Sequence, residues 1–101
     1  MALSKIQLSE LLSVYGATLT DKQRDACSMY CDCDCSLAEI ADDVGITRQG
    51  VRDAIVKAET SLVKLEESLH LAQFIRNLTI ALNDDDLTQL KQLVKQYVSK
   101  E

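Results

Sequence analysis

The sequence predicts a single all-α domain over residues 1–101, with a helix-turn-helix core over residues 20–60 and a helical packing and dimerisation extension over residues 61–101. Apolar residues make up 47% of the chain but only 4% of residues are aromatic, so the core must consist of aliphatic side chains, which suits helices packed on helices. The chain has no proline and only three glycines, whereas a sheet protein of this length needs more turn residues. Its apolar residues recur at steps of three and four, which is typical of one face of a helix.

Two helices are expected before the helix-turn-helix. Apolar residues over Leu3–Tyr15 lie at helical spacing, and Gly16 is expected to end this helix because glycine tolerates the left-handed conformation. The segment Thr20–Gln23 has the form of a capping box, in which the threonine hydroxyl accepts a backbone N–H and the glutamine side chain reaches back. We therefore predict a second helix that starts there and continues to about Tyr30.

Residues 36–58 are predicted to form the helix-turn-helix itself. Ser36–Glu39 is a second capping box and opens a short helix that ends near Asp43. Gly45 is expected to have a positive φ in the sharp turn, and Thr47 to cap the next helix, which starts at Arg48. Apolar residues at matching positions would hold the two helices at a steep angle: Leu37, Ile40, Ala41, Val44, Ile46, Val51, Ile55 and Ala58.

The exposed face of this last helix has side chains that suit nucleic-acid recognition. In such motifs the start of the second helix enters the major groove. Arg48 and Arg52 can bridge guanine O6 and N7, and Gln49 can pair with adenine. Thr47 and Lys57 are expected to meet phosphates. The sequence therefore predicts a DNA-binding surface made of these five residues.

Charge gives arguments for and against DNA binding. Three basic side chains and one aspartate between residues 47 and 58 give this segment a local charge of +2, although the whole chain has a net charge of −5. The preceding short helix carries Glu39, Asp42 and Asp43 where backbone phosphates would lie, and these carboxylates oppose tight binding. A helix-turn-helix used only for protein contacts is the alternative interpretation.

The extension contains neither glycine nor proline from residue 51 onward. Its apolar stripe shifts register near His70, so residues 48–82 form either one projecting helix of about 52 Å or two helices with a sharp break. A last helix is expected to follow the break at Asn83–Asp86. We predict a homodimer, in which the stripe is covered by a second copy through Leu62, Leu65, Leu69, Phe74 and Leu78.

No catalytic, metal or cofactor site is expected. The four cysteines at positions 27, 31, 33 and 35 lack the C-x-x-C spacing of zinc modules, so we interpret them as small reduced residues, with metal or redox sensing as the alternative. His70 has no partners at catalytic spacing, and Asp84–Asp86 suits a helix cap. No apolar run reaches the length of a membrane span and the first residues do not form a secretory signal, so a cytoplasmic protein that is not an enzyme is expected.

Several segments resemble known helix-turn-helix proteins. Leu19–Arg24, Ser36–Ala41 and Val44–Thr47 resemble the fourth conserved region of bacterial sigma factors, which reads the promoter −35 element. The sequence is more similar to the YlxM family, and this resemblance covers Leu11 to about Leu82. The segments that carry it are Tyr15–Ala17, Leu19–Gln23, Tyr30, Ser36–Ala41, Arg48–Val51 and Lys57–Glu59.

The YlxM resemblance implies a DNA-binding regulator with a link to the signal recognition particle pathway. It leaves open a protein-interaction module of the signal recognition particle machinery that does not bind DNA. The sequence departs from the family at Cys31, Cys33 and Cys35, where tyrosine and aspartate are usual. This difference concerns the turn before the helix-turn-helix and not the motif itself.

Overall fold

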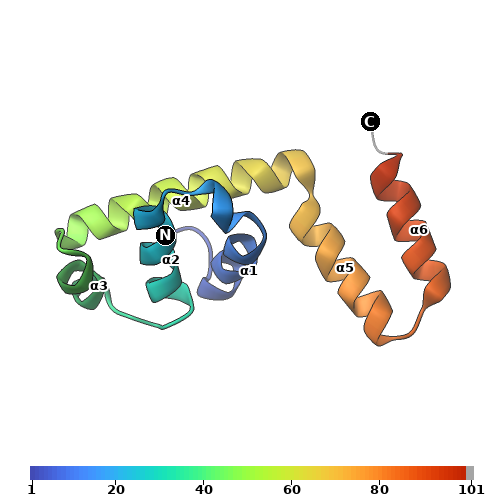
Figure 1. Cartoon of the computed structure of the whole chain (residues 1–101), viewed down its shortest axis with the longest axis horizontal. Helices are drawn as coiled ribbons and strands as arrows, with labels where there is room; N and C mark the ends of the chain where they lie inside the picture. The colour runs from blue at the N-terminus through green and yellow to red at the C-terminus, as the bar shows by residue number, and fades with distance from the viewer. Residues whose placement is uncertain (100–101) are drawn as a thin grey trace.

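The computed structural model describes residues 1–99, and these form six α-helices and one short 3-10 turn with no strand (Figure 1). The predicted all-α fold class is confirmed. In chain order the elements are α1 (Lys5–Tyr15), η1 (Gly16–Thr18), α2 (Asp21–Cys31), α3 (Leu37–Val44), α4 (Arg48–Leu69), α5 (Leu71–Asn83) and α6 (Leu87–Val98).

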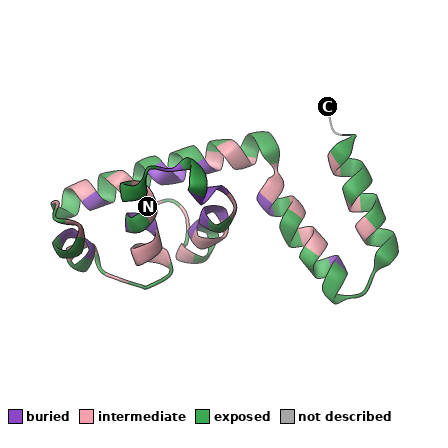
Figure 2. Cartoon of the chain, in the orientation of Figure 1, coloured by how far each residue is buried: buried purple, intermediate pink, exposed green. Residues whose placement is uncertain are grey.

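Helices α1 to α4 form the body of the molecule. The 22-residue α4 runs along the whole body, and α1, α2 and α3 all pack against it (Figure 1). Buried residues concentrate in these four helices (Figure 2). The largest fully buried side chains are those of Leu8, Cys27, Ile40, Val51, Ile55 and Leu62. The core is therefore aliphatic, as the composition predicts.

Local capping residues start the body helices where the sequence places them. Both halves of the capping box are formed at Thr20 and at Ser36, and Thr47 caps α4 by accepting the Gly50 N–H at 3.0 Å. A third capping box at Ser4, which the sequence analysis did not identify, starts α1. Each cap satisfies backbone N–H groups that have no partner within the helix. It therefore fixes the residue at which the helix begins.

The two glycines at helix ends behave differently. Gly45 ends α3 with φ of 79° and ψ of 32°, which confirms the predicted left-handed turn. Gly16 follows the end of α1 but has φ of −57°, so the expectation of a left-handed stop there is wrong. The chain instead tightens into η1, and a side chain at Gly16 would lie 3.3 Å from Leu12 Cδ1. A side chain at Gly16 would therefore find little space, although the backbone conformation there suits any residue.

The extension is not one long helix. The helix breaks at His70, which has φ of 52° and ψ of 27°, so the break is the correct one of the two alternatives for residues 48–82. The α5–α6 hairpin then projects from the body, and the Cα radius of gyration is 16.2 Å, against about 13 Å for a compact chain of this length. Phe74 and Tyr97 join the two helices with ring centroids 4.3 Å apart.

A polar cluster attaches the hairpin to the body. The Glu66 carboxylate accepts the Tyr15 hydroxyl at 2.6 Å and the backbone N–H groups of Ala72 and Gln73 at 2.9 and 3.1 Å. The Tyr15 hydroxyl in turn accepts the Leu71 N–H at 3.1 Å. Because His70 makes no side-chain cap, the first turn of α5 depends on these two body residues.

Candidate nucleic-acid interface

The α3–turn–α4 unit is rigid because its backbone and its buried side chains are both held. The Gly45 and Ile46 N–H groups donate to the Ala41 carbonyl at 2.9 and 3.2 Å, which closes the end of α3. On the inner side of α4, Val51 and Ile55 have no exposed surface. The opposite side of α4 is therefore turned outward in a fixed orientation.

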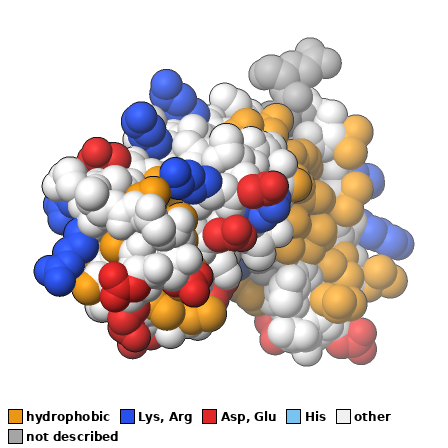
Figure 3. Space-filling view, turned by 60° about the vertical axis from the view of Figure 1, so that its left-hand side comes forward, with side chains coloured by type: hydrophobic (Ala, Val, Ile, Leu, Met, Phe, Trp, Pro, Cys, Tyr) orange, Lys and Arg blue, Asp and Glu red, His pale blue; other side chains and the backbone are white. Residues whose placement is uncertain are grey.

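The five residues predicted to bind nucleic acid do not all share one side of α4: Arg48 and Arg52 lie beside each other on its first two turns, whereas Lys57, nine residues after Arg48, points the opposite way. Thr47, Arg48, Gln49, Arg52 and Lys57 are exposed. Within residues 1–99, neither Arg48 nor Arg52 takes part in an ion pair. Their guanidinium groups are therefore available to a ligand without breaking an internal contact. Seen with the α3–α4 end forward, basic side chains project from this end of the molecule (Figure 3).

Gln49 is partly engaged within the helix. Its Nε2 donates to Asp53 Oδ1 at 2.9 Å, which leaves Oε1 as an acceptor. The amide also keeps a second N–H, so it still has a donor and an acceptor for N7 and N6 on the major-groove edge of an adenine. One turn further along, Val56 is 41% exposed and offers an apolar contact of the kind that a thymine methyl group accepts. Val56 is not among the five residues that the sequence predicts for this face.

The acidic residues of α3 are also exposed, but they are not equivalent. Glu39 caps its own helix by accepting the Ser36 N–H at 3.0 Å, and this hydrogen bond lowers its pKa. Asp42 and Asp43 make no hydrogen bond or ion pair through their side chains in the part of the chain described. The two aspartates thus add negative charge beside α4 without a structural role that requires it.

Comparison with known proteins places the chain in a family. A family model described as "Putative helix-turn-helix protein, YlxM / p13 like" matches residues 3–100. The chain belongs to the UPF0122 family. A UPF0122 protein of Mycoplasma capricolum is 40% identical over 92 residues, which is 89% of this chain and 81% of that protein. One of Clostridium kluyveri is 42% identical over 74 residues, covering 73% of this chain and 67% of the relative.

The family match extends beyond the motif. A UPF0122 protein of Caldanaerobacter subterraneus is 51% identical, but over 63 residues that cover 62% of this chain and 54% of the relative. The family model, by contrast, reaches from α1 through α6. The resemblance predicted from the motif is confirmed, and membership of the UPF0122 family includes the hairpin as well as the helix-turn-helix.

The cysteines show no sign of a metal centre. Among the described residues the four thiols are free, and no three His, Cys, Asp or Glu side chains converge as ligands. Burial raises the pKa of Cys27 to about 12 and that of Cys31 to about 11, so both remain protonated thiols at neutral pH. The turn is held by polar contacts to α1, from Lys5 to Asp34 and from Ser9 to Asp32.

The residues predicted to form a dimer contact fall into different environments. Leu62 has no exposed surface and Leu65 packs against the same core, so Leu62 is wrong as a contact residue because the core of the body already buries it. Phe74 stacks on Tyr97 within the chain. Leu78 is half-buried and Leu69 is 46% exposed. The sequence analysis did not assign a contact role to the exposed aliphatic side chains of α6.

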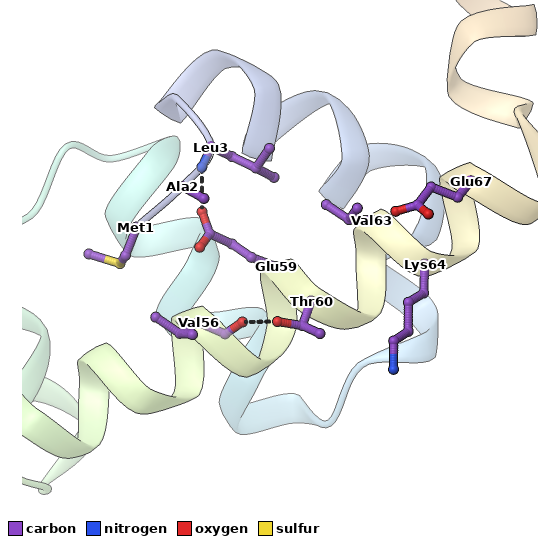
Figure 4. A pocket seen from close by; sticks show the side chains of 9 residues that line it. All are labelled: Met1, Ala2, Leu3, Val56, Glu59, Thr60, Val63, Lys64 and Glu67. Atoms are coloured by element: carbon purple, nitrogen blue, oxygen red, sulfur yellow. Dashed lines mark hydrogen bonds between the residues drawn. The ribbon is translucent and has the colours of Figure 1, made fainter.

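A groove of about 490 Å³ lies beside the candidate interface, between the N-terminal residues and α4 (Figure 4). Glu59 lies beneath the groove and is only 5% exposed. Its Oε2 accepts a hydrogen bond from the Leu3 N–H at 3.1 Å. Val56 lines the groove and is also exposed on the surface of α4. Glu59 thus holds Leu3 against α4 beside the candidate interface. No helix among residues 1–99 is both long and apolar enough to cross a membrane.

Proposed function

We propose that this protein is a DNA-binding regulator and that the first turns of α4 enter the major groove. The observation that carries the proposal is that Arg48 and Arg52 are exposed and free of ion pairs on a helix whose inner side is anchored by Val51 and Ile55. A rigid helix start with available arginines suits direct readout of base edges.

Each residue has a role in this proposal. Arg48 and Arg52 contact guanine, and Gln49 reads adenine through its side-chain amide. Thr47 at the start of α4 and Lys57 further along the helix contact phosphates. Base contacts give sequence preference, while phosphate contacts give affinity that falls as salt concentration rises. The protein needs no cofactor for this activity, and it acts in the cytoplasm.

The test is selection of bound duplexes from genomic fragments, followed by titration with the Arg48→Ala/Arg52→Ala variant. Each arginine–guanine pair is worth about 1–3 kcal/mol, so the double variant should bind a selected duplex at least about 30-fold more weakly. The matched control is Lys22→Ala/Lys64→Ala, which removes the same charge from exposed positions outside the face. This control should change affinity by less than about threefold at the same salt concentration.

Two outcomes would contradict the proposal. Equal loss of affinity in both double variants would mean that only net charge matters and that α4 does not read bases. Unchanged binding by Arg48→Ala/Arg52→Ala, with helicity preserved by circular dichroism, would exclude this face.

A second candidate function is favoured by the acidic surface of α3. Asp42 and Asp43 suit a basic partner, and we propose a ribonucleoprotein of the signal recognition particle machinery as the alternative. The variant Asp42→Asn/Asp43→Asn separates the two functions. If DNA is the ligand, removing these charges strengthens DNA binding. If the basic partner is the ligand, the same variant binds the purified signal recognition particle more weakly, and neither the variant nor the wild type binds DNA.

A further inference from the structure

The α5–α6 hairpin has an apolar stripe on each helix. Both stripes repeat at steps of three and four, which keeps them on one side of a helix that turns about 100° per residue. Several of these side chains are well exposed, including Leu82 at 65%, Leu87 at 63% and Val98 at 79%. The stripes consist of Leu71, Ile75, Leu78 and Leu82 on α5, and of Leu87, Leu90, Val94 and Val98 on α6.

Both stripes lie on the same side of the hairpin. On α5 the residues that face α6 include Phe74 and Asn77, and on α6 the residues that face α5 include Leu93 and Tyr97. From these inner positions each stripe is displaced by about 100° in the same rotational sense around its own helix. Because the two helices run in opposite directions, equal rotations bring both stripes to one side. A continuous apolar area over the hairpin is visible in Figure 3.

This hairpin face, as defined by the eight residues of the two stripes, is limited in size. Helices of 12 or 13 residues are about 20 Å long, and two of them side by side are about 20 Å wide. The face contains no charged side chain. Lys91 and Lys95 lie at its flank, and Asp84–Asp86 lies in the loop between the helices. An apolar area of this kind on a small helical protein is typical of an interface.

We propose that the hairpin face binds a second copy of this chain, so that two hairpins form an antiparallel four-helix bundle. A two-fold interface must be complementary to itself. The α5 stripe has steps of four, three and four residues, so it reads the same in both directions and fits an antiparallel copy. The absence of charge from the face removes the repulsion that a charged patch would meet in its own copy. A charge pattern, which commonly gives specificity for a different protein partner, is missing from the face.

The proposal assigns the dimer contact to the hairpin rather than to α4. Leu62 and Leu65 remain in the body core, while Leu82, Leu87, Val94 and Val98 supply the exposed surface. A face of about 20 by 20 Å gives about 800 Å² over two copies, which is below the size of standard stable interfaces, so we expect a weak dimer with a dissociation constant on the order of tens of micromolar. This inference does not depend on DNA binding, because the hairpin face lies outside the α3–α4 unit.

The test is sedimentation equilibrium of the full chain between about 1 and 200 µM. The wild-type protein should pass from a mass of 11.2 kDa to twice that value as concentration rises. The variant Leu82→Glu/Val94→Glu places two charges on the face and should raise the dissociation constant at least about 100-fold. The control Ile6→Glu/Ile80→Glu adds equal charge at positions that are 83% and 55% exposed outside the face, and should dimerise as the wild type does.

Three results would overturn the proposal. A wild-type chain that stays monomeric at the highest concentration excludes the dimer, and binding of that monomer to phosphatidylcholine–phosphatidylglycerol vesicles would assign the face to lipid. A face variant that still dimerises places the contact elsewhere. If Leu82→Glu/Val94→Glu loses helicity, the single variant Leu87→Gln gives the same comparison with a milder change, because Leu87 is 63% exposed.

Discussion

At the scale of single residues, the helix-turn-helix depends on one backbone conformation. Gly45 has φ of 79°, a value at which side chains other than hydrogen are disfavoured, yet a Cβ there would meet no atom within 4 Å. Gly16 is the opposite case, since its φ of −57° suits any residue but the space beside Leu12 is small. Substitutions at Gly45 and Gly16 therefore test two different effects: backbone strain at Gly45 and steric crowding at Gly16.

We predict that Gly45→Ala lowers the free energy of unfolding by about 1–2 kcal/mol, because alanine must adopt the left-handed conformation. Gly16→Ala should change it by less than about 0.5 kcal/mol, since reduced freedom of the unfolded chain offsets a contact with the flexible end of Leu12. Urea unfolding monitored by circular dichroism measures both. The reverse order of the two variants would contradict the conformational role of Gly45.

The start of α4 could be predicted because a local pattern determines it: Thr47 caps the helix, so Arg48 and Gln49 fall in its exposed first turn. The helical period alone does not place Arg48 outside, because Arg48 lies two turns before the buried Ile55 on the same side of the helix. Gly16 shows where this reasoning fails. The sequence indicates that the helix ends there, but not that the chain continues into the 3-10 turn η1 without a left-handed residue or that space beside Leu12 is limited, because packing of that kind leaves no local signal.

At the scale of helices, the sequence predicts where a helix begins better than it predicts where a long helix breaks. The capping boxes at Thr20 and Ser36 involve residues three apart, so the sequence alone is sufficient to locate them. The break at His70 appears in the sequence only as a shift of the apolar stripe. What stabilises it is the bond of Glu66 to Tyr15, 51 residues apart, and a contact at that separation cannot be inferred from spacing.

The Glu66 carboxylate gives a test of this junction. Burial alone would raise its pKa, but hydrogen bonds from the Tyr15 hydroxyl and from the Ala72 and Gln73 amides outweigh burial and lower it. A lowered pKa in the folded state means that Glu66 stabilises the fold above its ordinary value of about 4.5, and that this stabilisation is lost as pH falls through the lowered value.

We therefore expect Glu66→Gln to reduce the free energy of unfolding by about 1–2 kcal/mol at pH 7, because hydrogen bonds to a charged acceptor are replaced by weaker ones. The deficit relative to the wild type should shrink as pH falls below about 4.5, where the wild-type carboxyl begins to lose its charge. The exposed neighbour Glu67 provides the control variant Glu67→Gln. Chemical unfolding across this pH range measures the difference. Equal free energies of unfolding for the two variants would mean that Glu66 does not stabilise the junction between the body and the hairpin.

At the scale of the whole molecule, the body and the hairpin differ in how they are stabilised. The structure extends over 50 × 28 × 21 Å, and the buried core lies almost entirely in α1 to α4 (Figure 2). No residue of α6 is buried. Leu62 was assigned to a dimer contact because sequence shows a continuous stripe but not that α1 covers its first half. The sequence therefore predicts an apolar extension correctly and misplaces its free surface.

This difference predicts unequal hydrogen exchange along the chain. Backbone amides exchange when their segment opens, so α6, which lacks buried side chains, should exchange much faster than the α4 residues from Val51 to Leu62 at low protein concentration. If the hairpin face binds a second copy, raising the concentration above the dissociation constant should slow exchange in α5 and α6 at least about tenfold and leave α3 unchanged. Mass spectrometry of peptides from the intact protein measures this. Protection of α6 that is independent of concentration would mean that the hairpin is stable by itself, whereas protection that appears first in α3 would place the contact on the helix-turn-helix.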